Sequence, residues 1–212
     1  MPKQFSLVGQ KIALHPLQAT HADALVAAAA DGELWSLGFS RIPRENDVHA
    51  YIETALAGWR AGTVIPFVTT LVDGGNIVGS TRFWQIDTAN RKREIGSTWI
   101  ARSWQGGFVN AEAKYLMLRH AFDHANCIRV QLQTDALNAR SRAAILKLGA
   151  REEGTARNER IMPDGRIRDS VQFSIIVAEW PDVRERLEAR LGALGITPQL
   201  TIIPADEEGA SR

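Results

Sequence analysis

The spacing of apolar residues divides the first part of the chain into a β-segment and two helices. Residues 5–17 alternate apolar and polar positions around a central glycine, which indicates a strand or a hairpin. Residues 20–32 are predicted to form a helix, with Thr20 as its N-cap, Asp23 three residues on, and Gly32 as its stop. From about Asn46, apolar residues recur at intervals of four, three and four up to Trp59, which predicts a second helix with one apolar stripe.

Three strand-like runs follow, with polar turns between them. The runs are residues 64–72, 77–86 and 94–101, and one turn is Asp-Gly-Gly-Asn at 73–76. Such turns favour antiparallel neighbours, so we expect a meander. After a loop with two adjacent glycines, apolar positions over residues 111–125 repeat at four, three, four and three, which predicts a helix packed on the sheet.

The last third of the chain contains a strand, a helix, a hairpin and a final helix. Residues 127–134 are rich in β-forming side chains. Residues 138–149 form a helical pattern that begins with an N-cap asparagine and ends in glycine. A Pro-Asp-Gly turn separates two β-like runs, 154–162 and 167–177, and an amphipathic helix begins near Pro181.

This order of elements predicts an α/β fold. We expect one mixed, mostly antiparallel central sheet of about seven strands, with helices on both faces. At 212 residues one domain is the default, and we place it over residues 1–195. The tail, residues 196–212, is interrupted by proline and ends in acidic residues, so we expect it to be extended or partly disordered.

Charge and composition exclude several classes of partner. The formal net charge is +1, with basic and acidic residues mixed along the chain, so no basic patch indicates binding to nucleic acid or to a membrane surface. The first residues lack a basic segment followed by a long apolar run, and no window approaches the roughly 18 apolar residues of a membrane span. We therefore expect a soluble, cytoplasmic protein.

Cysteine and histidine offer no metal site. Cys127 is the only cysteine, which excludes an internal disulfide and multi-cysteine zinc patterns, and we interpret it as a small buried residue at the start of a strand. His120 and His124 are four residues apart but lack the glutamate of the metalloprotease pattern. We interpret this pair as a solvated helix face and predict no bound metal.

The dipeptide Gly106-Gly107 joins a strand to a helix and has two interpretations. It is either a tight turn in which glycine supplies positive φ, or a loop whose backbone N–H groups approach a phosphate at a helix N-terminus. The sequence contains no GxxxxGK(S/T) and no GxGxxG after its first strand, and the loop follows a meander rather than opening a βαβ unit. On the dipeptide alone both interpretations stay open.

Four features in a fixed order carry a family resemblance. They are the loop QGGFVN at 105–110, its long amphipathic helix, the strand CIRVQLQT, and a helix that opens with Asn-Ala-Arg-Ser at 138–141 and closes with Lys-Leu-Gly. Together they resemble the GNAT superfamily of acetyl-CoA-dependent N-acetyltransferases, and within it the RimJ/RimL-like branch of ribosomal-protein N-terminal acetyltransferases. The resemblance covers nearly the whole chain.

The resemblance implies a GNAT-like fold that binds acetyl-CoA. The strands of residues 94–101 and 127–134, the fourth and fifth of the expected sheet, splay apart to admit the pantetheine arm. The implied cofactor residues are Trp99, Ile100 and Ala101 on the first of these strands, Gln105, Gly106, Gly107, Phe108, Val109 and Asn110 on the pyrophosphate loop, and Asn138 and Ser141 on the later helix. Phe108 departs from the family pattern, which commonly has glycine there.

Transfer of an acetyl group to an amine needs a neutral amine and an acid for the departing thiolate. Many relatives use a tyrosine as the acid, but Ile145 occupies that position here, so the resemblance points to Ser141 instead. A purely structural role for Ser141 in the first helical turn stays equally open. Glu94 is the preferred base over Asp135, because it precedes the apolar run that borders the expected cleft; a surface carboxylate at a turn is the alternative.

The acceptor is expected to be a primary amine of a protein N-terminus, a lysine or a small molecule. The resemblance places its site at the first two helices and the late hairpin, and makes a homodimer plausible. The residues included in this site are Trp35, Phe39, Trp59, Trp84 and Arg166. The alternative function is a catalytically silent CoA-binding or regulatory module on the same fold, motivated by Phe108 and Ile145.

Overall fold

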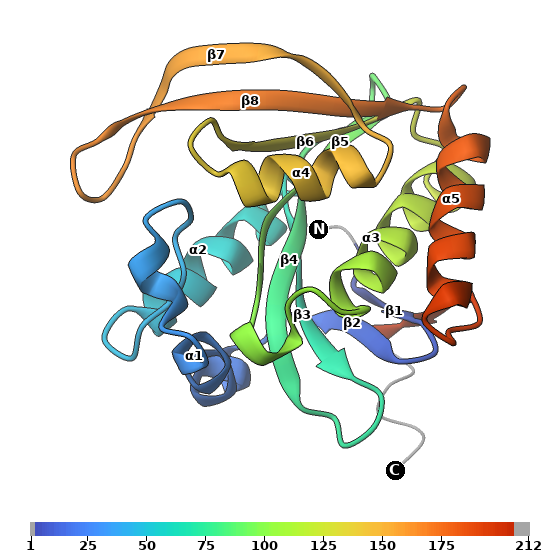
Figure 1. Cartoon of the computed structure of the whole chain (residues 1–212). Coiled ribbons are helices and arrows are strands. Elements are labelled where there is room, and N and C mark those ends of the chain that lie inside the picture. Colours follow the sequence, from blue (N-terminus) through green and yellow to red (C-terminus); the bar gives the residue numbers. More distant parts are fainter. Residues whose placement is uncertain (1–2, 206–212) are drawn as a thin grey trace.

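The computed structural model describes residues 3–205, which contain one mixed nine-stranded sheet and helices on both of its faces (Figure 1). The strands are β1 (Phe5–Val8), β2 (Ile12–Pro16), β3 (Ile65–Leu71), β4 (Ile77–Asp87), β5 (Lys92–Ile100), β6 (Arg129–Asp135), β7 (Arg151–Ile161), β8 (Ile167–Ile176) and β9 (Thr201–Pro204). The α-helices are α1 (Ala22–Ala30), α2 (Val48–Arg60), α3 (Val109–Arg119), α4 (Ala139–Lys147) and α5 (Trp180–Ala193).

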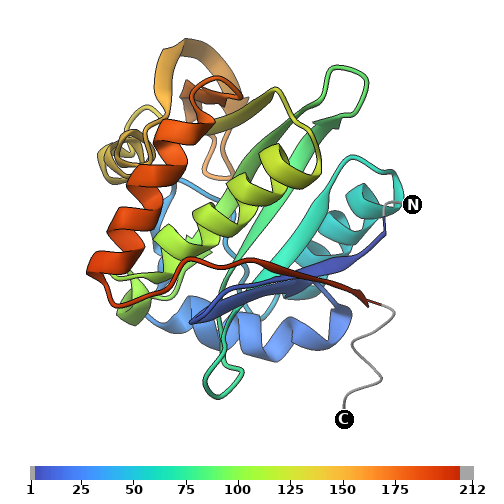
Figure 2. The same ribbon diagram turned by 90° about the vertical axis from the view of Figure 1, so that its right-hand side faces the viewer.

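The strand order is β7-β8-β6-β5-β4-β3-β2-β1-β9, and β5 with β6 is the one parallel pair in the described sheet. The predicted fold class is therefore confirmed. The sheet has nine strands rather than about seven, because residues 5–16 form an antiparallel hairpin and Thr201–Pro204 adds a strand beside β1. Figure 2 shows this last strand running along β1. The remainder of the predicted tail, 206–212, lies outside the described residues.

Two apolar cores lie on opposite faces of the sheet (Figure 2). Helices α3 and α5 pack against each other on one face, and α1 and α2 cover the other face. The buried side of α3 includes Tyr115, Leu116 and Met117, each at most 1% exposed. An isolated helix of 11 residues is only marginally stable in water, so α3 depends on the burial of these side chains against the sheet. No helix among the described residues is long and apolar enough to cross a membrane.

A π-helix over His120–His124 continues α3 and corrects one interpretation. His120 is not on a solvated face: its ring stacks on Phe5 with centroids 4.4 Å apart and contacts Phe83. Burial lowers the pKa of His120 to about 3. The spacing of the two histidines could not reveal this burial, because the His120 ring is enclosed by β1 and β4, which are distant from it in sequence. Cys127 is buried as expected.

The parallel strands β5 and β6 pair over only part of their lengths. Their register runs from Lys92 opposite Arg129 to Ile95 opposite Leu132. Beyond that step β5 stays paired with β4 alone, so within the described sheet the other edge of Gly96–Ile100 has no strand partner. The predicted splay of these two strands is therefore present, and it opens the sheet beside the start of α3.

Candidate active site

A β-bulge lies in the half of β5 that pairs with β4 but not with β6. Arg82 of β4 pairs with Gly96 and Ser80 pairs with Trp99, so Ser97 and Thr98 together oppose one residue. Ser97 has a φ of 48°, a left-handed conformation that is strained for a residue other than glycine. Bulges are common next to active sites, where they re-aim a side chain or end the pairing of strands. Here the bulge interrupts the pairing of β5 with β4, in the segment of β5 whose other edge has no strand partner in the described sheet.

A cavity of about 430 Å³ opens on the α2 side of this gap. Its volume is within the ordinary range of small-ligand sites. The lining comes from the loop between α1 and α2 (Phe39, Ser40, Arg41), from α2 (Tyr51, Thr54), from β4 to β6 (Arg82, Trp84, Glu94, Gly96, Ser97, Gln133, Thr134) and from the β7–β8 hairpin (Arg160, Ile161, Met162, Pro163, Arg168). Segments distant in sequence thus build one site.

Glu94 is a buried wall residue of this cavity rather than a surface carboxylate. It is 2% exposed and accepts a hydrogen bond from Gln131 Nε2 at 3.1 Å. Trp84 lies opposite it on β4, and a side chain at Gly96 would overlap the Trp84 indole. Burial raises the pKa of Glu94 to about 7 and outweighs the neighbouring Trp84 N–H and the Gln131 amide, which both lower it. A carboxyl group with this pKa exchanges protons readily near neutral pH.

The glycine loop lies at the other end of β5. A 3₁₀ turn over Arg102–Trp104 follows the strand, and Gln105 Nε2 donates to the Ile100 carbonyl oxygen at 2.6 Å. Gly106 has a φ of 81°, so glycine is required there for the turn. A Cβ at Gly106 or at Gly107 would meet no atom within 4 Å, so this loop faces open space.

Helix α3 begins at Val109 without a capping side chain, so its first N–H groups point out of the helix end. Phe108 is the N-cap residue, with φ −78° and ψ −26°. Any residue adopts this conformation, so a glycine is not needed at position 108. The Phe108 ring packs against the apolar core and lies edge-on to Trp104, with centroids 6.2 Å apart. The loop therefore keeps the features of an anion-binding helix start.

Asn138 and Ser141 lie at the first turn of α4. Asn138 Oδ1 accepts a hydrogen bond from the Ser141 backbone N–H at 3.0 Å, which confirms Asn138 as the N-cap. Within residues 3–205 the Ser141 hydroxyl makes no hydrogen bond, and its residue is half-buried. Ile145, one turn further along, is buried in the core. Neither Asn138 nor Ser141 lines the cavity that contains Glu94.

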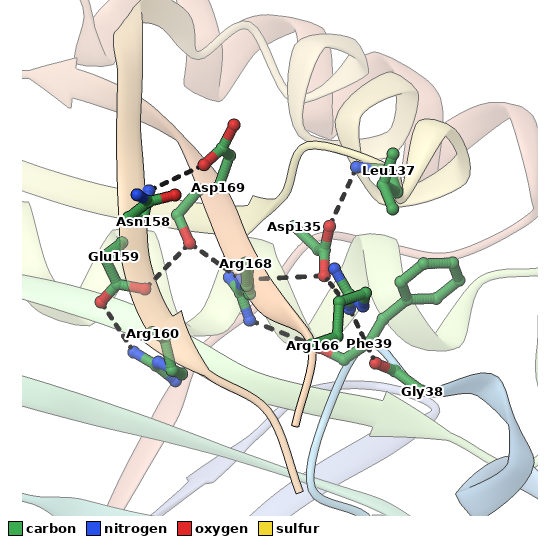
Figure 3. Close-up of polar contacts among 11 residues, drawn as sticks. Gly38, Phe39, Asp135, Leu137, Asn158, Glu159, Arg160, Arg166, Arg168 and Asp169 are labelled. Carbon is green, nitrogen blue, oxygen red and sulfur yellow. Dashed lines mark hydrogen bonds and ion pairs between the residues drawn. The ribbon is translucent and has the colours of Figure 1, made fainter. Parts of the chain in front are cut away.

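Asp135 is bound to two arginines of the β7–β8 hairpin (Figure 3). It is 1% exposed, and Arg166 Nη2 donates to its Oδ2 at 2.6 Å, while Arg168 Nε lies 4.0 Å away. Burial raises the pKa of Asp135, but the hydrogen bonds from Arg166 and from the Leu137 N–H outweigh it, so the pKa is below its usual value. Asp135 is thus an ionised structural anchor and a poor proton acceptor.

The same arginines attach the hairpin to the loop between α1 and α2 (Figure 3). Arg166 Nη2 donates to the Gly38 carbonyl oxygen at 3.1 Å, and Arg168 Nη1 donates to that of Phe39 at 3.3 Å. These bonds place Phe39 at the cavity, where Trp84 also lies. Trp35, Trp59 and Arg166, the other expected acceptor-site residues, are not among its lining.

Several residues of the site were not found from the sequence. They are Ser97 at the bulge, the cavity arginines Arg41, Arg82, Arg160 and Arg168, and Lys114 of α3. Lys114 Nζ donates to Thr98 Oγ1 at 2.7 Å, and burial lowers its pKa to about 7. A charged residue inside an apolar strand or on the buried side of a helix is the signal that could have identified Arg82 and Lys114.

Among residues 3–205, no group of three or more His, Cys, Asp or Glu side chains is placed to hold a metal ion.

Comparisons with known proteins agree with this architecture. Residues 11–151 match the family model described as "Acetyltransferase (GNAT) domain". The chain is 30% identical over 146 residues to "Putative ribosomal N-acetyltransferase YdaF" of Bacillus subtilis, which covers 68% of this chain and 78% of that protein.

Solved structures give the same result. One, from T. thermophilus, is described as a "putative acetyltransferase"; it is 35% identical with a TM-score of 0.78, covering 90% of this chain and 98% of the other. Mycobacterium smegmatis RimJ, solved with CoA-disulfide, shares the fold at 23% identity and a TM-score of 0.75, covering 92% and 97%. The chain therefore belongs to the GNAT acetyltransferase family and is an acetyl-CoA-dependent N-acetyltransferase.

Proposed function

We propose that this enzyme acetylates the α-amine of a peptide and that Glu94 is the general base. The observation that carries the proposal is the position of Glu94, buried in the cavity wall at the point where β5 and β6 separate. The B. subtilis relative, named as a ribosomal N-acetyltransferase, supports a peptide amine as the acceptor. The β7–β8 hairpin and the α1–α2 loop both line the cavity, and a volume of about 430 Å³ has room for the first residues of a chain terminus.

Three observations support the assignment of the acetyl-CoA residues. The β6-facing edge of Trp99 and Ile100 has no strand partner in the described sheet, α3 has no capping side chain, and the glycine loop faces open space. The backbone of Trp99, Ile100 and Ala101 would bind the pantetheine arm, and residues 105–110 would bind the pyrophosphate. Acetyl-CoA supplies an activated thioester.

In the reaction an N–C bond forms and the C–S bond breaks, so the amine nitrogen must lose a proton and the sulfur must gain one. The Glu94 carboxylate accepts the proton of the amine. Its pKa of about 7 lies close to that of a peptide α-amine, about 7.7–8.0, so the transfer is nearly balanced in energy. The Gln131 hydrogen bond orients the carboxylate.

Ser141 is the proposed acid for the departing sulfur, and solvent restores its proton. Its hydroxyl is free of hydrogen bonds within the described part of the chain, and its position in the first turn of α4 is held by the Asn138 cap. The buried Ile145 carries no proton to donate. Asn138 has its Oδ1 engaged by the cap, which leaves its amide N–H groups to bind the pantetheine arm.

Release of free thiol from acetyl-CoA in the presence of a peptide panel tests the proposal. Peptides with a free N-terminus should be consumed, and mass spectrometry should place the acetyl group on the α-nitrogen. The same peptides with a formylated N-terminus are the matched control and should be inert. Turnover of small-molecule amines with no turnover of any peptide would show that the acceptor class is wrong.

A further inference from the structure

The acceptor cavity has an unbalanced charge. Four arginines line it, Arg41, Arg82, Arg160 and Arg168, against the single carboxyl group of Glu94. Arginine is costly to gather in one place unless anions compensate it, because like charges repel and each guanidinium loses water. The partner of each arginine therefore indicates how much positive charge remains for a ligand.

Two of the four arginines are already paired with carboxylates. Arg168 lies 4.0 Å from Asp135 Oδ2 and donates to Ser170 Oγ at 2.8 Å. Arg160 Nη2 lies 3.1 Å from Glu159 Oε1, at the start of the hairpin tip (Figure 3). These two arginines belong to the network that positions the hairpin.

Arg41 and Arg82 form no ion pair with any carboxylate of residues 3–205. Arg41 is exposed at the cavity rim, but Arg82 is half-buried. Its guanidinium carbon lies 5.4 Å from the centre of the Tyr51 ring, and its Nε is buried without a hydrogen-bond partner in that described part. An unsatisfied buried donor costs stability, and an anionic ligand would satisfy it.

Arg82 also lies close enough to the proposed base, Glu94, for one acceptor to contact both residues. Arg82 pairs with Gly96 across β4 and β5, and Glu94 is two residues before Gly96. Side chains two residues apart on a strand share a face, so Arg82 and Glu94 are diagonal neighbours, with Cα atoms about 7–8 Å apart in a regular sheet. The two do not form an ion pair. A single acceptor can therefore contact both, with its amine at Glu94 and an anionic group at Arg82.

We propose that the acceptor carries a carboxylate a few bonds from its reactive amine, and that Arg82 is the residue that selects it. This inference rests on the proposed function and narrows its substrate class to peptides with an acidic side chain at the first or second residue. Arg82 binds the carboxylate through paired N–H donors, which the planar guanidinium presents in a fork. Arg41 at the rim adds positive charge on the entry path.

The test compares acidic peptides with their amides at saturating acetyl-CoA. Two pairs are used, with Glu or Gln at the first residue in one pair and at the second residue in the other. Free glutamate and free glutamine form a third pair, which separates a small amino-acid acceptor from a peptide. In at least one pair, kcat/KM for the acidic member should be about 10- to 100-fold higher, the range for loss of a charged hydrogen bond.

The variant Arg82→Gln should lower kcat/KM for the acidic member alone and bring the ratio close to one. Arg157→Gln is the matched control, because Arg157 is an exposed residue of β7 that does not line the cavity. It should keep the wild-type ratio. The affinity of each variant for acetyl-CoA and its thermal unfolding midpoint show whether a loss is specific to the acceptor. If Arg82→Gln does not fold, the ratio of kcat/KM between acidic and amide acceptors, measured on the wild-type enzyme, still tests the proposed selection of a carboxylate.

The outcomes separate this inference from the function on which it rests. Equal turnover of acidic and amide members by the wild-type enzyme overturns the inference and leaves the proposed function in place. Turnover of neither peptides nor amino acids overturns both. A preference for free glutamate over every peptide supports carboxylate selection by Arg82 and overturns the peptide acceptor.

Discussion

Gln131 Nε2 donates a hydrogen bond to Glu94 Oε2 at 3.1 Å across the parallel pair β5–β6, one step before the last paired residues of these strands. The bond holds the Glu94 carboxyl group in the wall of the cavity at the point where the sheet opens. Burial at this position raises the pKa of Glu94 to about 7. The hydrogen bond thus positions the proposed base, and burial leaves the carboxyl group able to exchange a proton near neutral pH.

Replacement of Glu94 by Gln should remove the base while it keeps the hydrogen-bonding shape. We expect kcat/KM to fall by about 10²- to 10⁴-fold, the usual contribution of a positioned acid or base. In the wild type, kcat should rise with pH through about 7, as Glu94 loses its proton, and then level off. Glu94→Gln should lack this limb, measured as thiol release from pH 5 to 9.

Glu185→Gln is the control for that experiment, since Glu185 is exposed on α5. It should retain both the rate and the pH profile. The acceptor's own amine can also make the rate rise with pH. A second acceptor whose amine has a different pKa separates the two causes, because the pH-rate profile shifts between acceptors only if the amine causes the rise. An unchanged rate and profile in Glu94→Gln would show that the carboxyl group of Glu94 is not the base.

Glu94 should also lower stability at alkaline pH. Its folded-state pKa, about 7, is raised above the ordinary 4.5, so its favourable contribution is complete below pH 4.5 and is lost as the pH rises through 7. Glu94→Gln cannot ionise. It should therefore match the wild type at pH 4 and exceed its free energy of unfolding by about 3 kcal/mol at pH 8, measured by urea denaturation. If the free energies of unfolding of Glu94→Gln and the wild type differed by the same amount at both pH values, the raised pKa of the Glu94 carboxyl group would be contradicted.

The two loop glycines should respond differently to alanine. Gly106→Ala forces a side chain into φ 81° and should lower the free energy of unfolding by about 1–2 kcal/mol. Gly107→Ala adds a methyl group that meets no atom within 4 Å and should leave stability nearly unchanged. Both should weaken acetyl-CoA binding, measured by calorimetry, because the methyl group blocks close approach of the pyrophosphate.

Gly192→Ala is the matched control, because a Cβ at Gly192 in α5 also meets nothing within 4 Å. It should bind acetyl-CoA like the wild type and be slightly more stable, as expected for alanine inside a helix. Unchanged affinity in Gly107→Ala would mean that the loop is only a strand-to-helix turn.

Ser141→Ala should separate chemistry from helix capping. The cap uses the Ser141 backbone N–H, which alanine retains, so stability and acetyl-CoA affinity should stay close to wild type. The rate of acetyl transfer should fall by about 10²-fold or more if the hydroxyl is the acid. Asn138→Ala is the counterpart: it removes the cap and should cost about 1 kcal/mol in the free energy of unfolding. A fully active Ser141→Ala enzyme would reduce Ser141 to a structural residue.

Asp135→Asn should loosen the hairpin from the α1–α2 loop. It leaves Arg166 and Arg168 without their shared carboxylate and should lower the free energy of unfolding by about 1–3 kcal/mol at pH 7. Because the folded-state pKa of Asp135 is lowered, its contribution is present above pH 3.8 and is lost as the pH falls through the folded value. The loss should therefore shrink in acid, measured by urea denaturation.

Asp73→Asn, at a side chain that is 92% exposed, is the control for Asp135→Asn and should change stability little at either pH. The acceptor KM of Asp135→Asn should rise, since Phe39 loses part of its anchor while the acetyl-CoA residues are untouched. Equal losses at pH 7 and in acid would mean that the carboxylate charge of Asp135 contributes nothing to stability.

Local sequence signals determined much of this protein. Apolar periodicity and turn chemistry placed the helices and strands, because an amphipathic element carries its own pattern of contacts with the core. The strand-to-helix loop with Gly106 was recognisable because positive φ demands glycine. Family resemblance supplied the splay of β5 from β6. Glu94 was found from its position before an apolar run, with its burial and pKa still unknown.

Only the tertiary structure decided which of these residues meet and in what charge state. Glu94 and Asp135 are both carboxylates beside strands, but burial raises the pKa of Glu94, while the hydrogen bond from Arg166 outweighs burial and lowers that of Asp135. The cavity arginines come from three segments far apart in sequence. Burial and electrostatic pairing depend on neighbours brought together by the sheet, and no local pattern encodes them.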